Sequence, residues 1–235
     1  GAVPRIVETD ASTGFKLTAE RLKREIAARR PKAFLYNSPG NPAGIVYDRR
    51  EVEAIAAVLL EERIALISDE IYEFLTFEGV EHVSPVTAVP ELRAGSVVAT
   101  GVSKSYAMTG WRIGFALADE PVAYRMGAFQ AHATGCPNAI SQWAALEAVR
   151  GGAGERERMR VEFEKRKRMF GERLSRIPKI TFPEPGGAFY FTVMFKDGVL
   201  NNRQRLPIEE PAIRAHIESL VQNVSPDKRF VYYLM

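Results

Sequence analysis

Three short apolar segments, each followed by polar residues, constrain the fold of this chain more than any other feature. They cover residues 32–36, 63–68 and 96–100. Short apolar runs that are bounded by turn residues are typical of buried strands in a parallel sheet. Helical patterns lie between and around them, and this alternation is typical of βαβ units. The sequence therefore predicts an α/β fold with a mostly parallel sheet flanked by helices.

The helix signals are local and have physical causes. Thr18 is placed to cap a helix over residues 19–29, which Pro31 would stop. Asp48 and Glu51 have the spacing of a capping box ahead of an apolar stripe. Further helices are expected from Pro121 towards Gln130, over 139–149 and over 155–173.

Polar side chains follow each of the three predicted strands. Asn41 lies in a Pro/Gly-rich loop over residues 37–44, Asp69 and Tyr72 follow the second strand, and Lys104 follows the third. Ligands of open α/β sheets bind at the carboxyl ends of parallel strands, so these residues are expected at one crevice. A desolvated lysine amine is a nucleophile towards carbonyls, and Schiff-base chemistry with pyridoxal phosphate is a main use of that property. Each residue alone is more often a turn, packing or surface residue, but their combination favours a site.

Segments 37–44, 68–72 and 101–114 resemble the class I and II aminotransferases, which are pyridoxal-phosphate enzymes of fold type I. The resemblance runs over about residues 1–195, and around 108–112 and 130–145 it is most like the bacterial-type aspartate and prephenate aminotransferases. It implies a partial large domain with a mostly parallel sheet, plus part of a small α+β domain.

The resemblance also implies catalytic roles for three residues. Lys104 would hold pyridoxal phosphate as a Schiff base and, as the free amine, carry the proton during transamination. Asp69 would pair with the pyridine nitrogen and keep it protonated, so that the ring accepts electrons. Tyr72 would donate a hydrogen bond to the ring oxygen O3′.

Three more residues are implied to bind the cofactor. Asn41 would share the O3′ contact with Tyr72. Arg112 would take the phosphate as a bidentate fork, with Ser103 as a weaker candidate for the same group.

The function that the resemblance implies is transfer of an amino group from aspartate, glutamate or an aromatic amino acid to a 2-oxo acid, within amino acid metabolism and biosynthesis. A homodimer is expected. Two alternatives stay open: another chemistry of the same fold type, such as 1-aminocyclopropane-1-carboxylate synthesis or a β-lyase, and an inactive remnant that serves as an interaction module.

The Gly-rich stretch 151–154 is the best candidate for a domain boundary. We expect a large pyridoxal-phosphate-binding domain over 1–150, and a connecting helix with a partial small domain over 151–235. Residues 182–191 match the entry into the small domain of the family.

The chain is expected to be truncated at both ends relative to the family. Its start resembles the middle of the large domain, and the resemblance fades after Phe195. The arginine that clamps the substrate α-carboxylate is not recognisable among the arginines of the C-terminal part, which are Arg203, Arg205, Arg214 and Arg229. The chain alone is therefore expected to be inactive or to bind the cofactor weakly, and its full-length parent to be active.

Composition agrees with this interpretation without dictating it. The formal charge is +3, from 32 basic and 29 acidic residues, which does not favour a nucleic-acid partner. No apolar run approaches the ~20 residues of a membrane span. The single cysteine, Cys136, is typical of a reducing compartment, so a cytoplasmic protein is expected. No metal site is expected, because nothing completes a ligand set around His132 and Cys136.

Overall fold

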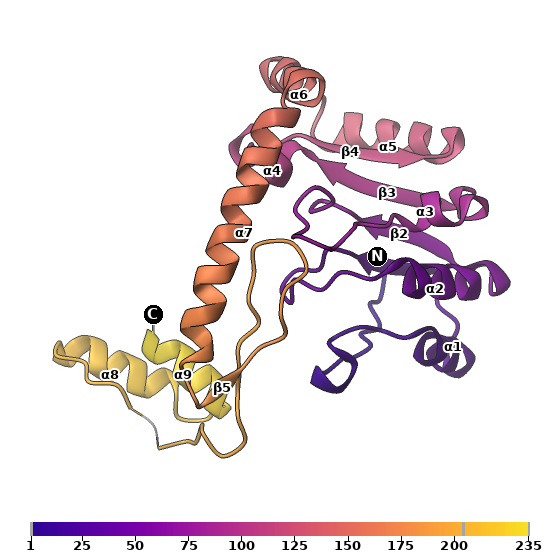
Figure 1. The fold of residues 1–235 in the computed structure, drawn as a ribbon. Coiled ribbons are helices and arrows are strands. Elements are labelled where there is room, and N and C mark those ends of the chain that lie inside the picture. Colours follow the sequence, from indigo (N-terminus) through magenta and orange to yellow (C-terminus); the bar gives the residue numbers. More distant parts are fainter. Residues whose placement is uncertain (1, 204, 235) are drawn as a thin grey trace. The chain divides into compact units, whose positions relative to one another are not determined.

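The computed structural model describes residues 2–203 and 205–234 (Figure 1). The chain is organised as two compact units. The first contains Gly1–Gly171 and Pro183–Thr192, and the second contains Glu172–Phe182 and Val193–Met235. The domain boundary near residue 150 stays a prediction.

The first unit is built on a four-stranded sheet (Figure 1). Its strands, in spatial order, are β1 (Ala33–Asn37), β2 (Ala65–Asp69), β3 (Ser96–Gly101) and β4 (Gly114–Ala118). β1, β2 and β3 are parallel, and β4 pairs with β3 in the antiparallel direction. Asn37 is in register with Asp69, and Asp69 with Ala99. The predicted mostly parallel sheet is confirmed, and the polar residues that follow its parallel strands start from the same edge.

Helices α1 (Ala19–Ala28) and α2 (Arg49–Glu61) begin at the predicted caps. The hydroxyl of Thr18 accepts a hydrogen bond from the amide of Arg21 at 3.2 Å. The amide of Glu51 donates to the Asp48 carboxylate at 2.9 Å, and the amide of Asp48 donates to the Glu51 carboxylate at 2.8 Å. These reciprocal bonds satisfy amides that the first helical turn leaves without a partner.

The main core lies between these helices and one face of the sheet. It includes Leu22, Ile26, Val52, Ile55 and Leu59 from the helices and Tyr36 and Leu66 from the strands. Short elements α3 (Pro85–Ala88) and η2 (Pro90–Arg93) complete the same core.

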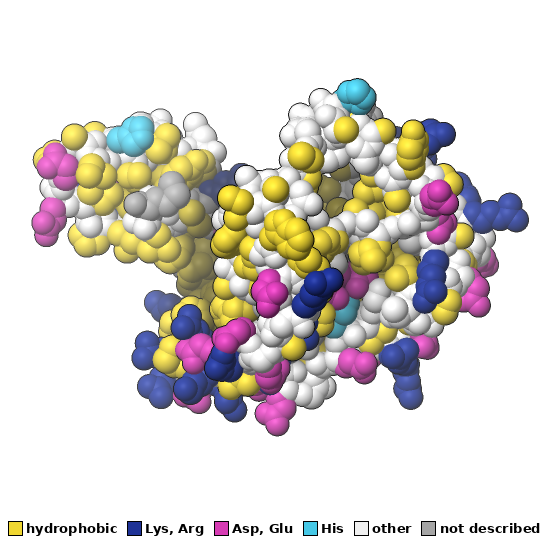
Figure 2. Space-filling model, turned by 90° about the horizontal axis from the view of Figure 1, so that it is seen from above, with side chains coloured by type: hydrophobic (Ala, Val, Ile, Leu, Met, Phe, Trp, Pro, Cys, Tyr) yellow, Lys and Arg dark blue, Asp and Glu magenta, His cyan; other side chains and the backbone are white. Residues whose placement is uncertain are grey.

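The opposite face of the sheet is open within the described residues. Side chains alternate along a strand, so Leu35 and Ile67 point away from the core and are 68% and 40% exposed. On β4 the core side is exposed as well: Leu117, in register with Val98 on that side, is 57% exposed. The sequence predicts buried strands, and this prediction is wrong for one face. Figure 2 shows hydrophobic side chains at the surface of the molecule.

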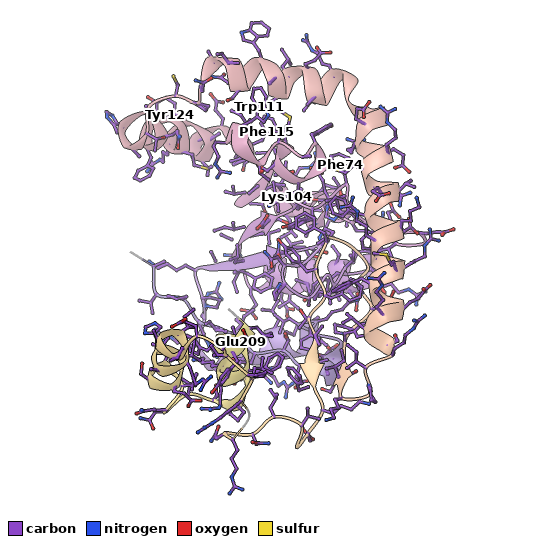
Figure 3. All side chains as sticks on the ribbon, turned by 90° about the vertical axis from the view of Figure 1, so that its left-hand side faces the viewer. Phe74, Lys104, Trp111, Phe115, Tyr124 and Glu209 are labelled. Carbon is purple, nitrogen blue, oxygen red and sulfur yellow. The ribbon has the colours of Figure 1, made fainter. Side chains whose placement is uncertain are left out.

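The chain continues through α4 (Val102–Ser105), η3 (Thr109–Trp111), α5 (Glu120–Ala133), α6 (Ala139–Gly151) and α7 (Ala153–Ser175). The helices predicted from Pro121, over 139–149 and over 155–173 are confirmed. Several aromatic side chains of this region are exposed, including Tyr124 on α5 and Trp143 on α6 at 77% and 72%. Figure 3 labels Tyr124 together with Trp111 and Phe115. No described helix combines the length and apolar character that a membrane span requires.

The second unit contains β5 (Ile180–Thr181) paired with β6 (Met194–Phe195), and helices α8 (Pro211–Leu220) and α9 (Pro226–Leu234). Arg229 is buried and donates to the carbonyl of Val221 at 3.1 Å and to the hydroxyl of Tyr233 at 3.2 Å. Arg205 pairs with Glu218 at 3.4 Å, and Arg214 donates to the carbonyl of Ile208 at 2.9 Å. These arginines are thus engaged within their own unit.

Candidate active site

The loop after β1 is tied directly to the end of β2. The side-chain amide of Asn37 donates to the carbonyl of Asp69 at 3.1 Å, and its oxygen accepts from the amide of Asn41 at 2.9 Å. The end of β1 therefore fixes where Asn41 lies relative to Asp69.

Asn41 and Tyr72 meet at Tyr190. The hydroxyls of Tyr72 and Tyr190 are 2.6 Å apart, and the side-chain amide of Asn41 donates to the Tyr190 hydroxyl at 3.4 Å. Burial, the hydrogen bond with Tyr190 and the negative charge of Asp69 raise the pKa of Tyr72 above its usual range. Tyr72 therefore stays a protonated phenol at neutral pH.

Lys104 lies in α4, the single helical turn that follows β3. Its amine is 5.8 Å from the ring centroid of Tyr72 and 5.5 Å from that of Phe189. Within the described part of the chain the amine makes no ion pair and no hydrogen bond. A partly buried amine over two aromatic faces, with no carboxylate to hold it, is available to react with a ligand.

Asp69 is the last residue of β2 and is partly buried. One carboxylate oxygen, Oδ1, accepts from the amide of Ile71 at 3.2 Å. Among the described residues no donor reaches the second oxygen, Oδ2. The carboxylate is thus oriented by the backbone and has one oxygen available for a ligand.

The structure does not bring Arg112 into this group. Arg112 is exposed, and its Nη1 donates to the carbonyl of Thr109 at 3.0 Å. Its φ of 53° is in the left-handed region, which is uncommon for a residue with a side chain. Ser103 precedes Lys104 in α4 and is partly buried. The phosphate roles of Arg112 and Ser103 stay predictions.

Sequence reasoning did not select Phe189 and Tyr190 as site residues. They belong to the segment 182–191 that matches the small-domain entry of the family, and the structure forms a turn there next to a bridge between Thr76 and Gly187. The ring of Phe189 lies 5.3 Å from that of Tyr72, edge to face. The aromatic run after two glycines is a signal of packing, and nothing in it indicates that the rings reach the lysine.

A buried carboxylate next to Asp69 was also missed. Glu70 is 3% exposed and accepts hydrogen bonds from Ser68 at 2.8 Å and Ser84 at 2.7 Å. Its other oxygen is 2.9 Å from Nε2 of His82. Burial opposes ionisation of Glu70, but the hydrogen bonds from His82, Ser84 and Ser68 outweigh it and lower the pKa of Glu70.

Glu70, Glu73 and His82 offer ligand atoms that lie within 4.8 Å of one another. The Glu73 carboxylate accepts from the hydroxyl of Thr100 at 2.6 Å, so the acids of this group already serve protein donors. Cys136 and His132 are exposed.

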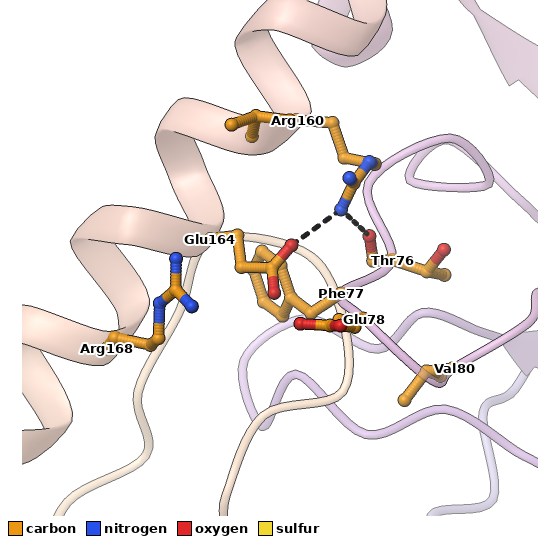
Figure 4. Close-up of a pocket in the computed structure, with 8 residues that line it drawn as sticks. Thr76, Phe77, Glu78, Val80, Arg160, Glu164 and Arg168 are labelled. Atoms are coloured by element: carbon orange, nitrogen blue, oxygen red, sulfur yellow. Dashed lines mark hydrogen bonds and ion pairs between the residues drawn. The ribbon is translucent and has the colours of Figure 1, made fainter.

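A separate cavity of about 390 Å³ opens between α7 and the loop after Tyr72 (Figure 4). Arg160 crosses it, donating to Glu164 at 2.7 Å and to the carbonyl of Thr76 at 3.4 Å. Its lining consists of Thr76, Phe77, Glu78, Val80, Arg160, Val161, Glu164 and Arg168. None of the predicted site residues lines it, and its two arginines face two acids, so it is distinct from the residues around Lys104.

Comparison with known proteins gives a consistent result. The family model described as aminotransferase class I and II matches residues 1–215. The aspartate aminotransferase of Bacillus sp. (strain YM-2) is 43% identical over 190 residues, which are 81% of this chain and 48% of that protein. The aspartate/prephenate aminotransferase of Cereibacter sphaeroides is 38% identical over 191 residues, with the same coverage of 81% and 48%.

A solved structure is similar over a comparable share of the chain. The aspartate aminotransferase from Rhizobium meliloti superimposes with a TM-score of 0.80 at 36% sequence identity, covering 84% of this chain and 49% of that one. The chain thus spans about half the length of the curated relatives it matches.

Proposed function

Because this chain belongs to the class I and II aminotransferases, we propose that it carries the lysine-bearing cofactor site of a pyridoxal-phosphate-dependent transaminase. The reaction would move an amino group from an amino acid to a 2-oxo acid. Relatives named aspartate aminotransferase favour aspartate as the donor, with glutamate or an aromatic amino acid as alternatives, and the aspartate/prephenate relative favours prephenate as one 2-oxo acid acceptor. The observation that carries the proposal is the unpaired amine of Lys104, held beside Tyr72 at the edge where Asp69 and Asn41 are also fixed.

The donor set fits pyridoxal phosphate in its chemistry. The cofactor has an aldehyde, a phenolic oxygen and a pyridine nitrogen, and the chain supplies an amine at Lys104, donors at Tyr72 and Asn41, and a carboxylate at Asp69. Two observations support the fit: the amine of Lys104 and the oxygen Oδ2 of Asp69 have no partner among the described residues. Arg112 or Ser103 would take the phosphate.

When bound, pyridoxal phosphate supplies an electron sink for the carbanion at the substrate Cα. Lys104 would hold the cofactor through its amine, and the free amine would take the proton from the substrate Cα and deliver it to the former aldehyde carbon of the cofactor. The free oxygen Oδ2 of Asp69 would accept a hydrogen bond from the pyridine nitrogen of the cofactor and keep that nitrogen protonated. The hydroxyl of Tyr72 would donate a hydrogen bond to the ring oxygen O3′ of the cofactor, because the raised pKa of Tyr72 keeps its phenol protonated. The rings of Tyr72 and Phe189 exclude water from one side of the amine.

We also propose that the enzyme is a cytoplasmic homodimer. Exposed apolar side chains on β4, α5 and α6, such as Leu117, Tyr124 and Trp143, support the dimer because a partner subunit could cover them. The cation for the substrate α-carboxylate is not assigned to a residue of this chain.

The proposal is tested by titrating the purified chain with pyridoxal phosphate and recording its absorbance after desalting. Because the chain alone is expected to bind the cofactor weakly, we expect a small retained band of the lysine-bound cofactor in the wild type, none in Lys104→Ala, and a still smaller one in Asp69→Asn. Lys165→Ala is the matched control, because Lys165 on α7 is 75% exposed. A band of equal strength in wild type and Lys104→Ala would refute the proposal.

A further inference from the structure

Arg156 of α7 contacts both segments that carry the proposed site. Its guanidinium carbon is 3.6 Å from the ring centroid of Phe74, which follows closely after Tyr72 in the chain. Its Nη1 donates to the hydroxyl of Tyr106 at 3.1 Å, and Tyr106 is the residue that ends the short helix containing Lys104. One side chain therefore bridges the Tyr72 segment and the Lys104 segment.

The packing around Arg156 places α7 directly on both segments. A methyl group at Gly152, the residue just before α7, would lie 2.9 Å from the ring of Tyr106, so the chain entering α7 lies directly against that ring. Further along α7, Met159 and Phe163 pack on the core cluster of Tyr72, Leu75 and Ala188. Small movements of the helix are therefore transmitted to both segments.

Arg156 differs from several other arginines of α7 in its ion pairing. Arg160 pairs with Glu157 and Glu164, and Arg166 pairs with Glu162. Within the described residues, no carboxylate lies within ion-pair distance of Arg156. Its charge is directed at the face of Phe74 and the oxygen of Tyr106, an arrangement that suits a planar guanidinium and that an ammonium group could not reproduce.

We propose that Arg156 is a positioning residue that holds the amine of Lys104 in place relative to Tyr72. Stacking on Phe74 anchors the Tyr72 segment, and the hydrogen bond to Tyr106 anchors the end of α4. Together they keep the amine 5.8 Å from the Tyr72 ring and 5.5 Å from the Phe189 ring. The inference rests on the proposed roles of Lys104 and Tyr72. Figure 3 labels Phe74 beside α7 and Lys104 in the same region of the molecule.

The test reads the position of the amine without requiring bound cofactor. The lysines of the chain are reductively methylated with ¹³C-formaldehyde, and the methyl signal of Lys104 is assigned by its loss in Lys104→Arg. In the wild type, the ring currents of Tyr72 and Phe189 should displace this signal from those of the exposed lysines. Arg156→Met keeps an unbranched stem but removes the guanidinium. In this variant we expect the Lys104 methyl signal to move towards the signals of the exposed lysines.

Two further variants complete the design. Arg166→Met is the matched control, since Arg166 lies on the same helix at 5.9 Å from the Phe163 ring and pairs with Glu162. It should leave the Lys104 signal in place. Tyr106→Phe removes only the oxygen that accepts from Arg156, so it should give a shift in the same direction even where Arg156→Met does not fold. An unchanged Lys104 signal in Arg156→Met or Tyr106→Phe, or an equal shift in Arg166→Met, would overturn the inference.

Cofactor binding separates this inference from the proposed function. Where the wild type binds pyridoxal phosphate through Lys104, Arg156→Met should bind it about tenfold more weakly, which corresponds to about 1.4 kcal/mol. Absence of Lys104-dependent binding in the wild type would refute the proposed site, while the methyl signals would still decide whether Arg156 positions the amine.

Discussion

Neutralising Glu70 should weaken the fold in a way that depends on pH. Glu70→Gln keeps the shape of the side chain but removes the charge that accepts from Ser68, Ser84 and His82. A hydrogen bond to a charged group contributes roughly 1.5–3 kcal/mol and one between neutral groups roughly 0.5–1.5, so each bond loses roughly 1–1.5 kcal/mol and the three together lose about 3–4.5 kcal/mol. Relief from burying a charge offsets part of this loss. We expect a fall of about 1–3 kcal/mol in the free energy of unfolding at pH 7.

The pH dependence follows from the direction of the pKa shift. The pKa of Glu70 in the folded state lies below the ordinary value of 4.5. The ionised carboxylate therefore stabilises the folded state at pH values above 4.5, and this contribution is lost as the pH falls through the folded pKa. Protonated Glu70 resembles glutamine, so the difference between wild type and Glu70→Gln should shrink in acid.

The assay is urea unfolding of both proteins, followed by circular dichroism, in steps from pH 7 to below pH 4. Glu53→Gln is the control: Glu53 is an exposed acid of α2, 3.9 Å from Arg49, and its loss should change stability by about 0.5 kcal/mol or less. A Glu70→Gln variant as stable as wild type at pH 7, or a difference that grows in acid, would refute the reasoning.

Two predictions concern packing in the first unit. Leu59→Ala should cost about 2–5 kcal/mol in urea unfolding, because Leu59 is 1% exposed in the main core, whereas Leu60→Ala, at 36% exposure, should cost clearly less; equal losses would contradict the position of the core. Gly187→Ala should lower stability by about 1–3 kcal/mol, because the added methyl would lie 2.8 Å from the Leu75 carbonyl oxygen and 2.9 Å from Pro39. Gly110→Ala, with open space around it, is its control, and a Gly187→Ala protein with the melting temperature of wild type would show that this turn is loosely packed.

The parts of the fold that the sequence predicts are those with local causes. The caps at Thr18 and Asp48 and the long helix after Gly152 depend on neighbouring residues, and the structure contains all of them. The antiparallel placement of β4 and the exposed face of the sheet depend on which segments meet, so strand patterns alone did not reveal them.

The candidate site likewise contains residues that the sequence pattern predicts and residues that only the three-dimensional fold brings together. Asn41 and Asp69 are brought together because parallel register places the ends of β1 and β2 side by side. Tyr190 joins them from a distant part of the chain, and no spacing rule could connect it to Tyr72. Arg112 is exposed and bonded to the carbonyl of Thr109 in its own turn, and its predicted contact with the cofactor phosphate stays a prediction.

The central claim is that Lys104 is the residue to which pyridoxal phosphate binds covalently. The direct measurement is to incubate the chain with the cofactor, reduce the adduct with borohydride, digest the protein and locate the modification by mass spectrometry. We predict that, at limiting cofactor, the modification is found on the peptide that contains Lys104. Modification spread evenly over exposed lysines such as Lys165 and Lys23, with no enrichment at Lys104, would contradict the account.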